Sequence, residues 1–186
     1  KHLGIPKETE LAGAGVSYCA VCDGAFFKNQ EVAVVGGGNT ALQDALYLAS
    51  ICRKVYLIHR RNEFRASKIL VDRARELDNV EFILNAQVKE LLGEDSLTGI
   101  KVEGNCGPRT YEVSGLFIAV GMIPDNAIAE NLELNNGYIV TDENMRTSVE
   151  GVYAAGDIRA KEMRQVITAA SDGAIAANSA AMFLMI

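Results

Sequence analysis

Apolar residues in the first two thirds of the chain form short runs separated by amphipathic stretches. We expect strands at residues 32–35, 55–58 and 80–84, where Val and Ile are frequent, and helices at residues 40–51 and 65–77 between them. Strands that alternate with helices along a chain are typical of a parallel sheet with crossover helices. The pattern therefore predicts an α/β fold.

A second set of apolar runs follows this alternation. Residues 97–103 and 110–113 flank a turn rich in Gly, Asn and Pro at residues 104–108, and this pattern predicts a hairpin. Residues 115–121 are expected to form one more buried strand, and we place a domain boundary after residue 121. The remaining elements expected are short strands at residues 138–141 and 151–155 and a long Ala-rich helix at residues 165–184.

Composition narrows the class of protein. The chain has 186 residues, a net charge of −6 and four Cys residues. An acidic balance argues against nucleic acid as a partner, because binding phosphates needs an excess of Lys and Arg. Four Cys residues are too few for a disulfide-stapled secreted scaffold, so we expect a cytoplasmic protein. The apolar run at residues 173–186 is shorter than the ~20 residues of a membrane span, so we expect no membrane association.

Two thiols stand three positions apart in the segment Cys19-Ala20-Val21-Cys22. This spacing allows a reversible disulfide and predicts a redox centre. Half of a zinc site is the alternative, with Cys52 and Cys106 as further ligands, but those two lack the paired spacing of zinc ribbons. Asp23 follows Cys22 directly; it can transfer a proton during thiol–disulfide exchange, or it can be an ordinary turn aspartate. We favour the redox centre and expect no metal.

A glycine fingerprint follows the first predicted strand. The segment Gly36-Gly37-Gly38-Asn39-Thr40-Ala41 has the form G-x-G-x-x-A and opens a predicted helix, as a dinucleotide site requires. Gly36 allows the tight turn, and Gly38 allows a pyrophosphate to approach the backbone and the helix N-terminus. The chain is therefore expected to bind a dinucleotide.

The residues after the second strand indicate which dinucleotide is bound. An NAD site places an acid there for the ribose hydroxyls, whereas this strand ends in His59-Arg60-Arg61, with Arg65 close behind. Residues 53–75 hold eight Lys and Arg residues and two acids, although part of this charge is solvated helix surface. Guanidinium groups favour a 2′-phosphate, so we expect NADPH.

Four segments, in this order, resemble low-molecular-weight thioredoxin reductase. They are residues 15–24 with the dithiol, 35–41 with the glycine turn, 58–66 with the arginines, and 151–157 with Gly156-Asp157. The flavoprotein component of alkyl hydroperoxide reductase shares the dithiol and is an alternative. The resemblance implies a three-layer Rossmann-like (FAD/NAD(P)-binding) domain with a β-meander at residues 1–121, which binds NADPH, and part of a second, FAD-binding domain at residues 122–186.

The resemblance also implies roles for individual residues. Cys22 would face the flavin, Cys19 would exchange with a thioredoxin-like protein disulfide, and Asp23 would be their acid–base partner. We therefore expect Cys19 to be the accessible thiol and Cys22 to be shielded beneath it. The implied NADPH-binding residues are Gly36, Gly38, Asn39, Thr40, His59, Arg60, Arg61 and Arg65, and the implied FAD-binding residues are Gly156, Asp157, Arg164, Gln165 and Val166.

One departure from the family concerns the FAD domain. In the family this domain is split around the NADPH domain, and its first half would precede Lys1. We therefore expect the isolated chain to hold no stoichiometric FAD, and two interpretations stay open. The chain is either the larger part of an FAD-dependent NADPH–thioredoxin oxidoreductase, expected to be a homodimer at full length, or an inactive NADPH-binding module.

Overall fold

The computed structural model describes residues 1–105, 107–129 and 131–185. These residues form two compact units, Lys1–Gly121 and Met122–Ile186. Cys106, named above as a possible zinc ligand, lies outside the described residues.

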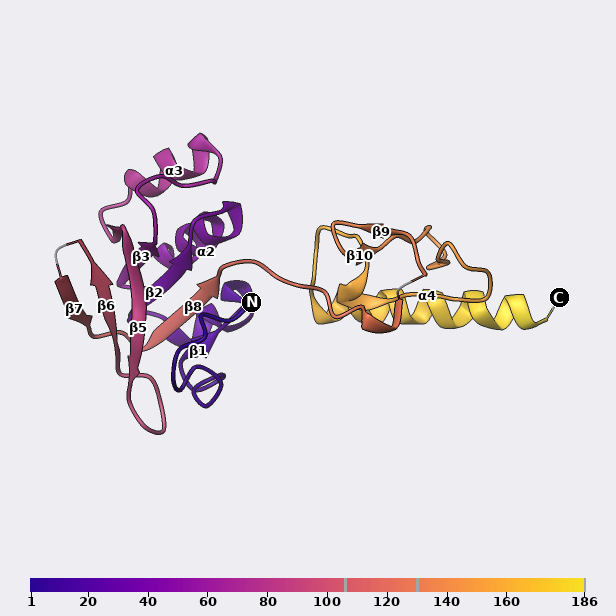
Figure 1. The fold of residues 1–186 in the computed structure, drawn as a ribbon, viewed down its shortest axis with the longest axis horizontal. Helices are drawn as coiled ribbons and strands as arrows, with labels where there is room; N and C mark the ends of the chain where they lie inside the picture. Colours follow the sequence, from indigo (N-terminus) through magenta and orange to yellow (C-terminus); the bar gives the residue numbers. More distant parts are fainter. Residues whose placement is uncertain (106, 130, 186) are drawn as a thin grey trace. The chain divides into compact units, whose positions relative to one another are not determined.

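A five-stranded parallel sheet forms the centre of the first unit (Figure 1). Its strands lie in the order β1-β8-β2-β3-β4, and each neighbouring pair is parallel. The strands are β1 (Val16–Ser17), β8 (Gly115–Ala119), β2 (Glu31–Gly36), β3 (Lys54–His59) and β4 (Val80–Leu84). The predicted parallel α/β sheet is confirmed.

Side chains of the central strands are buried on both faces of this sheet. Val32 and Val34 of β2 join a hydrophobic cluster with residues of α2 (Asn39–Ala49). Helix α3 (Lys68–Arg75) packs beside α2 on the same face. Since successive residues of a strand point to opposite faces, Ala33 and Val35 join a second cluster on the other face.

A three-stranded antiparallel sheet covers that other face. It consists of β5 (Ala86–Leu92), β6 (Gly99–Gly104) and β7 (Gly107–Tyr111), in the order β5-β6-β7. Val88 and Ile100 of this sheet belong to the same cluster as Val35. Helices, parallel sheet and antiparallel sheet make three layers, which confirms the predicted three-layer fold with a β-meander.

Strand β5 is the longest strand that the sequence pattern missed; the two-residue strands β1 and, in the second unit, β9 (Leu134–Asn135) were not predicted either. The register of β5 shifts between Val88 and Glu90, so apolar and polar positions do not alternate regularly along it. The predicted hairpin turn was also too long, because Gly104 pairs with Gly107 and Pro108 already lies in β7. A β-strand at the edge of a sheet tolerates Pro, because one side of its backbone is left without a ladder partner.

The second unit contains a small hairpin and one long helix. Strands β9 (Leu134–Asn135) and β10 (Tyr138–Ile139) pair antiparallel, and helix α4 spans Val166–Leu184. Short 3-10 turns occur at η2 (Ala127–Ala129) and η3 (Gly156–Ile158). The strand predicted at residues 151–155 was wrong, because only an isolated bridge between Arg146 and Tyr153 forms there.

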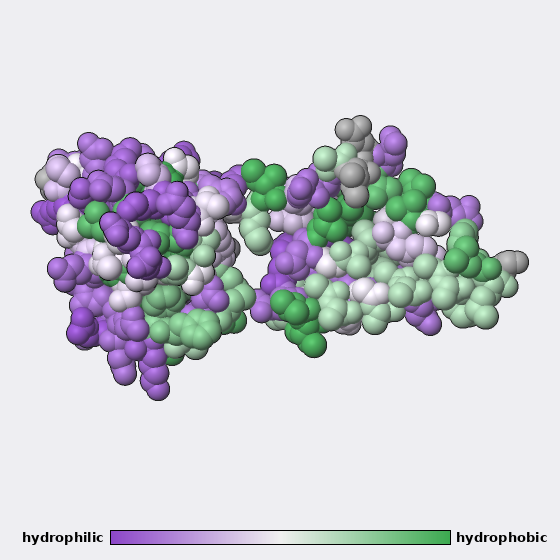
Figure 2. All heavy atoms as spheres, turned by 90° about the horizontal axis from the view of Figure 1, so that it is seen from below, coloured by the Kyte–Doolittle hydropathy of each residue, from purple (hydrophilic) through white to green (hydrophobic). Residues whose placement is uncertain are grey.

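Hydrophobic residues gather along α4 on the face of the second unit shown in Figure 2. Several of them are largely exposed, including Val166, Ile167 and Leu184. In the part of the chain that the structure describes, no helix combines the length and apolar character required to cross a membrane.

Candidate functional site

Cys19 and Cys22 form a disulfide at the end of β1, with 5.3 Å between their Cα atoms. Cys19 is the N-cap of the short helix α1 (Ala20–Asp23), and its Sγ accepts a hydrogen bond of 3.2 Å from the backbone N–H of Cys22. A second short helix, η1 (Gly24–Phe27), follows directly. The local geometry therefore closes the dithiol that the spacing predicted.

The exposure of the two cysteines is the reverse of our expectation. Within the first unit Cys22 is exposed, whereas Cys19 is only partly exposed. Val21 and Phe26, which is 78% exposed, lie in the same stretch of chain. In the closed disulfide of this unit Cys22 is thus not shielded, and the accessibility of the two reduced thiols stays a prediction.

Cys52, the third cysteine considered above, lies in the hydrophobic core. It is buried in the hydrophobic cluster beneath α2, and this burial raises the pKa of its thiol to about 11. A thiol in such a site is inert, because the reactive species is the thiolate. Among residues 1–105, 107–129 and 131–185, no group of three His, Cys, Asp or Glu side chains is placed to hold a metal ion.

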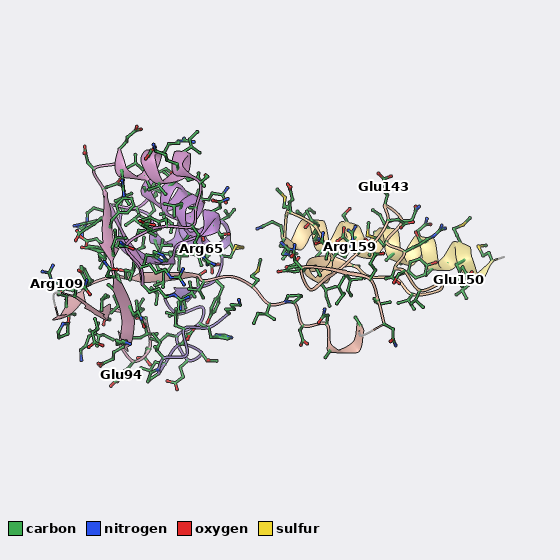
Figure 3. The ribbon with its side chains drawn as sticks, turned by 45° about the horizontal axis from the view of Figure 1, so that its top comes forward. Arg65, Glu94, Arg109, Glu143, Glu150 and Arg159 are labelled. Carbon is green, nitrogen blue, oxygen red and sulfur yellow. A yellow bond between two sulfur atoms is a disulfide. The ribbon has the colours of Figure 1, made fainter. Side chains whose placement is uncertain are left out.

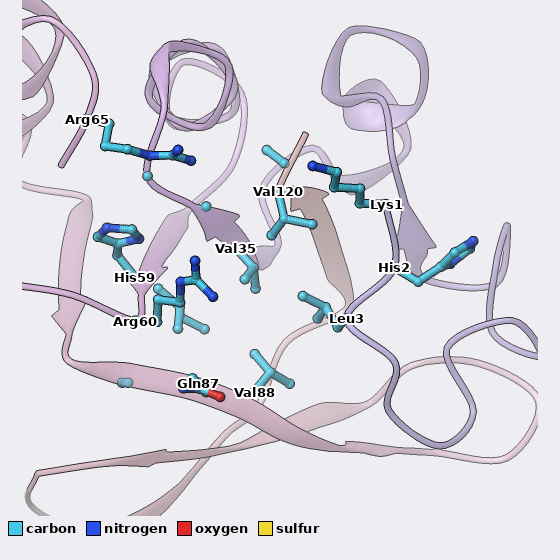
Figure 4. A pocket seen from close by; sticks show the side chains of 15 residues that line it. Lys1, His2, Leu3, Val35, His59, Arg60, Arg65, Gln87, Val88 and Val120 are labelled. Carbon is cyan, nitrogen blue, oxygen red and sulfur yellow. The ribbon is translucent and has the colours of Figure 1, made fainter. Parts of the chain in front are cut away.

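A cavity of about 480 Å³ opens at the carboxyl ends of the parallel strands (Figure 4). β2 continues through α2 to β3 on one side, whereas β8 lies on its other side. Open α/β sheets bind their ligands at such a change of strand order. Described residues from the candidate set that line the cavity are Gly36, Gly37 (within the predicted turn), His59, Arg60 and Arg65.

The glycine turn is shaped by close packing on one side and open space on the other. A Cβ atom at Gly36 would lie 2.6 Å from the Cβ of Ala41 and would collide with the carbonyl oxygen of Ala119. Around the same position at Gly38, no described atom lies within 4 Å. Gly36 thus brings α2 close to the sheet, and Gly38 leaves the helix N-terminus accessible to a ligand.

His59 packs its ring against Gly37, where any Cβ atom would collide with it. The side chain is 6% exposed, its ring stacks on Phe64 at 5.1 Å, and Nε2 lies 3.1 Å from the carbonyl oxygen of Glu63. Burial lowers the pKa of His59, the nearby arginines lower it further, and the hydrogen bond to Glu63 only partly opposes them. The lowered pKa favours the neutral form of His59, and its ring contacts both loops of the site.

Two hydrogen bonds fix the arginine-bearing segment to the glycine turn. The backbone N–H of Arg65 donates to the carbonyl oxygen of Gly37 at 2.7 Å, and that of Ser67 donates to Oδ1 of Asn39 at 2.8 Å. Arg60 and Arg65 extend their guanidinium groups toward the cavity (Figure 4). Arg61 and Thr40 are exposed but do not line it.

The candidate residues of the second unit meet at the N-terminus of α4. Gln165 caps this helix through a reciprocal pair of hydrogen bonds with Thr168. Arg164 donates to the carbonyl oxygen of Asp157 at 3.3 Å, and its guanidinium lies 4.1 Å from the ring centre of Tyr138. Gly156 and Val166 begin the two helical segments, so all five predicted residues lie in one local assembly.

Sequence reasoning missed the carboxylate that holds this assembly together. Asp172 on α4 is 7% exposed and pairs with Arg159 and Lys161, each at 2.8 Å, while the N–H of Gly156 donates to it at 3.0 Å. Figure 3 labels Arg159 beside α4. Burial opposes ionisation, but the bonds from Lys161 and Arg159 outweigh it and lower the pKa of Asp172. A single acid in an Ala-rich helix gives no motif that could have revealed this.

A second missed carboxylate lies next to the dithiol. Glu8 is 3% exposed and accepts hydrogen bonds from the N–H groups of Leu3 and Gly4 and from the hydroxyl of Tyr18. Burial disfavours the charged form, yet these bonds lower the pKa of Glu8; burial and the carboxylate raise that of Tyr18 to about 12. Tyr18 directly precedes Cys19, so Glu8 ties residues 3–4 to the dithiol segment.

Comparison with known proteins gives the same picture. Thioredoxin reductases of Listeria monocytogenes and Bacillus subtilis are each 47% identical to this chain, over 99% and 96% of it. The crystal structure of thioredoxin reductase from Streptococcus pyogenes covers the whole chain with a TM-score of 0.94 and 44% identity. The chain spans 59% and 58% of the two relatives and 62% of that structure.

The resemblance to low-molecular-weight thioredoxin reductase is thereby confirmed at the level of sequence and fold. A family model described as pyridine nucleotide-disulphide oxidoreductase matches residues 1–173. This match includes the dithiol, the glycine turn, the arginine segment and the start of α4. The chain belongs to the pyridine nucleotide-disulphide oxidoreductase family.

Proposed function

We propose that this chain is the NADPH-binding and dithiol-bearing part of a flavin-dependent NADPH–disulfide oxidoreductase of the thioredoxin reductase type. The observation that carries the proposal is the closed Cys19–Cys22 disulfide in the same compact unit as a glycine turn and an arginine-lined cavity. A dinucleotide site supplies reducing equivalents and a dithiol accepts them. Residues 1–121 thus contain both the site that would bind the electron donor and the disulfide that would accept the electrons.

The cavity fits NADPH. Gly38 and the N-terminus of α2 would hold the pyrophosphate, because the open space at Gly38 lets a phosphate reach the backbone. Arg60 and Arg65 would bind the 2′-phosphate, whereas the exposed Arg61 does not line the cavity. Among the described residues that line the cavity none is acidic, so the group that receives the ribose hydroxyls in NAD sites is absent from that set.

The second unit fits the C-terminal part of an FAD site. The exposed Asp157 and the start of α4 at Val166 would hold the cofactor, and Arg164 and Gln165 would position them. When bound, FAD supplies the conversion of a hydride into electron pairs that can reduce a disulfide. Asp172 would stabilise this site without contacting the cofactor, because it binds the N–H of Gly156 and the side chains of Arg159 and Lys161.

The chain's own residues then carry out the thiol chemistry. Two electrons break the bond between Cys19 and Cys22, and two protons are needed to give two thiols. Asp23 would deliver and recover the proton at Cys22, while Cys19 would attack the disulfide of the partner protein. The partner we propose is a thioredoxin-like protein, the full-length enzyme would be a homodimer, and the small number of cysteines favours the cytoplasm.

The test is NADPH oxidation with oxidised thioredoxin as the acceptor, measured on purified protein saturated with FAD. Because the chain spans about three fifths of its relatives, the assay is repeated with the chain fused to the part of the Bacillus subtilis relative that it does not cover. Cys19→Ser and Cys22→Ser should abolish turnover, whereas Cys52→Ala should retain it. Turnover that survives loss of the dithiol, or no turnover in either form, would contradict the proposal.

A further inference from the structure

Ser17 lies between the sheet and the dithiol and is hydrogen-bonded to both ends of the redox segment. The side chain is 5% exposed. Its Oγ lies 2.7 Å from Oδ2 of Asp23 and accepts the backbone N–H of Cys19 at 3.1 Å. The carbonyl oxygen of Cys19 is a second possible acceptor at 3.3 Å, but the hydroxyl has one proton, and the shorter bond to a carboxylate is the stronger.

The strand holds Ser17 in a fixed position. Ser17 is the last residue of β1 and pairs with Phe117 of β8, which is almost fully buried. Asp23, by contrast, ends a helix of only four residues and is partly exposed. A short helix gives a terminal side chain little constraint of its own, so the hydroxyl supplies the constraint that α1 lacks.

We propose that Ser17 is a positioning residue that orients the Asp23 carboxylate for proton transfer to the dithiol. This inference rests on the proposed function, in which Asp23 is the acid–base group. The Ser17 hydroxyl donates its proton to Oδ2, which leaves Oδ1 as the oxygen that carries and releases the transferred proton. The same hydroxyl accepts the N–H of Cys19, so one atom sets the position of the acid relative to the disulfide.

The chemistry can be followed with a small dithiol in place of the flavin. In line with the proposed role of Cys19 as the exchanging thiol, a thiolate of dithiothreitol attacks Sγ of Cys19, the bond to Cys22 breaks, and Cys22 leaves as a thiolate that takes a proton from Asp23. The second thiol of dithiothreitol then closes its own ring and releases Cys19 as a thiol. Two electrons and two protons pass from the reagent to the protein, and Asp23 recovers its proton from solvent. A misplaced Asp23 slows the departure of Cys22.

The experiment measures the rate of this reduction over a range of pH, by alkylation and mass spectrometry of Cys19 and Cys22. The variants are Ser17→Ala, Ser17→Thr, Asp23→Asn and the double variant Ser17→Ala/Asp23→Asn. We expect Ser17→Ala to slow the reduction about tenfold, the size expected when a hydrogen bond to a charged group is lost. Its pH profile should approach that of Asp23→Asn, and Ser17→Thr, which keeps the hydroxyl, should behave like the wild type.

The double variant separates positioning from a merely structural role. If Ser17 acts through Asp23, adding Ser17→Ala to Asp23→Asn changes the rate no further. Equal rates for Ser17→Ala and wild type, or an additive loss in the double variant, would overturn the inference while the role of Asp23 stands. A wild-type profile for Asp23→Asn would instead remove the acid–base role itself. Thermal unfolding of each oxidised variant identifies any that fails to fold. If Ser17→Ala does not fold, the pH profile of Ser17→Thr is the test, and a profile that differs from that of the wild type would overturn the inference.

Discussion

Several polar side chains at the site form hydrogen bonds with backbone groups. Glu8 accepts two N–H groups, His59 meets the carbonyl of Glu63, and Asn39 accepts the N–H of Ser67. The sequence pointed to His59 and Asn39 through the motifs that contain them. It could not point to Glu8, Ser17 or Asp172, because their partners lie at no characteristic spacing along the chain.

Asp44 on α2 gives a prediction about stability. Burial raises the pKa of its carboxyl to about 6, above the value of about 3.9 in an unfolded chain. The folded state therefore binds the proton more tightly, and this group's contribution to stability falls as pH rises from about 4 to about 6. Asp44→Asn should raise the free energy of unfolding by about 2 kcal/mol at neutral pH and change it little below pH of about 4.

Urea unfolding at the two pH values checks this prediction. Asp72→Asn is the matched control, because Asp72 is an exposed acid on the neighbouring helix. It should change the unfolding free energy by less than about 0.5 kcal/mol at either pH. A destabilising effect of Asp44→Asn at neutral pH would show that the charged carboxylate has a favourable partner.

The arginines give a prediction about cofactor choice. Arg60 and Arg65 line the cavity, whereas Arg61 does not. Each charge-assisted bond to a 2′-phosphate contributes about 1.5–3 kcal/mol, so Arg60→Ala or Arg65→Ala should reduce the preference for NADPH over NADH about tenfold or more. Arg61→Ala should have a smaller effect.

Calorimetric titration of both nucleotides measures this preference. Arg73→Ala, which removes the same charge from the exposed face of α3, is the control and should leave the preference unchanged. If the wild type binds NADH and NADPH equally, or if Arg73→Ala matches Arg60→Ala, the assignment of the 2′-phosphate site is wrong.

At the scale of elements, the site forms where two loops that follow neighbouring parallel strands pack against each other. The glycine turn after β2 and the segment after β3 meet where the ring of His59 packs on Gly37. The sequence predicted both strands and both motifs, because β-branched runs and Gly-rich turns are local signals. It did not predict this contact or strand β5, since both depend on packing between distant residues and not on periodicity.

Substitutions at two adjacent glycines, Gly37 and Gly38, distinguish the structural role of this contact between the loops from its role in binding. Gly37→Ala would push a methyl group into the His59 ring and should lower the free energy of unfolding by about 1–3 kcal/mol, the usual cost of overpacking. Gly38→Ala meets open space and should leave stability nearly unchanged, yet it should weaken NADPH binding because its methyl occupies the approach of the pyrophosphate.

Chemical unfolding and NADPH titration of both variants make the comparison. The expected pattern is loss of stability in Gly37→Ala and loss of affinity with intact stability in Gly38→Ala. If Gly38→Ala binds NADPH as tightly as the wild type, the pyrophosphate does not lie against this turn.

At the scale of the whole molecule, two compact units carry the two sets of candidate residues. Residues of the dithiol, the glycine turn and the arginine segment lie in Lys1–Gly121, and the residues around the start of α4 lie in Met122–Ile186. Family and fold could be predicted because these motifs follow one another in a fixed order. The accessibility of the two cysteines could not be predicted, because it depends on how α1 is folded and on what covers it.

The central claim is that Cys19–Cys22 is a redox-active disulfide and not a structural one. Its reduction potential tests this directly: the protein is equilibrated in dithiothreitol buffers of known ratio, and the two thiols are quantified by alkylation and mass spectrometry. We predict a reversible two-electron transition with a midpoint above about −300 mV, since exposed, exchange-active disulfides lie above that value and structural ones below it. A midpoint below about −300 mV, or a reduced pair that retains stoichiometric zinc, would contradict the account.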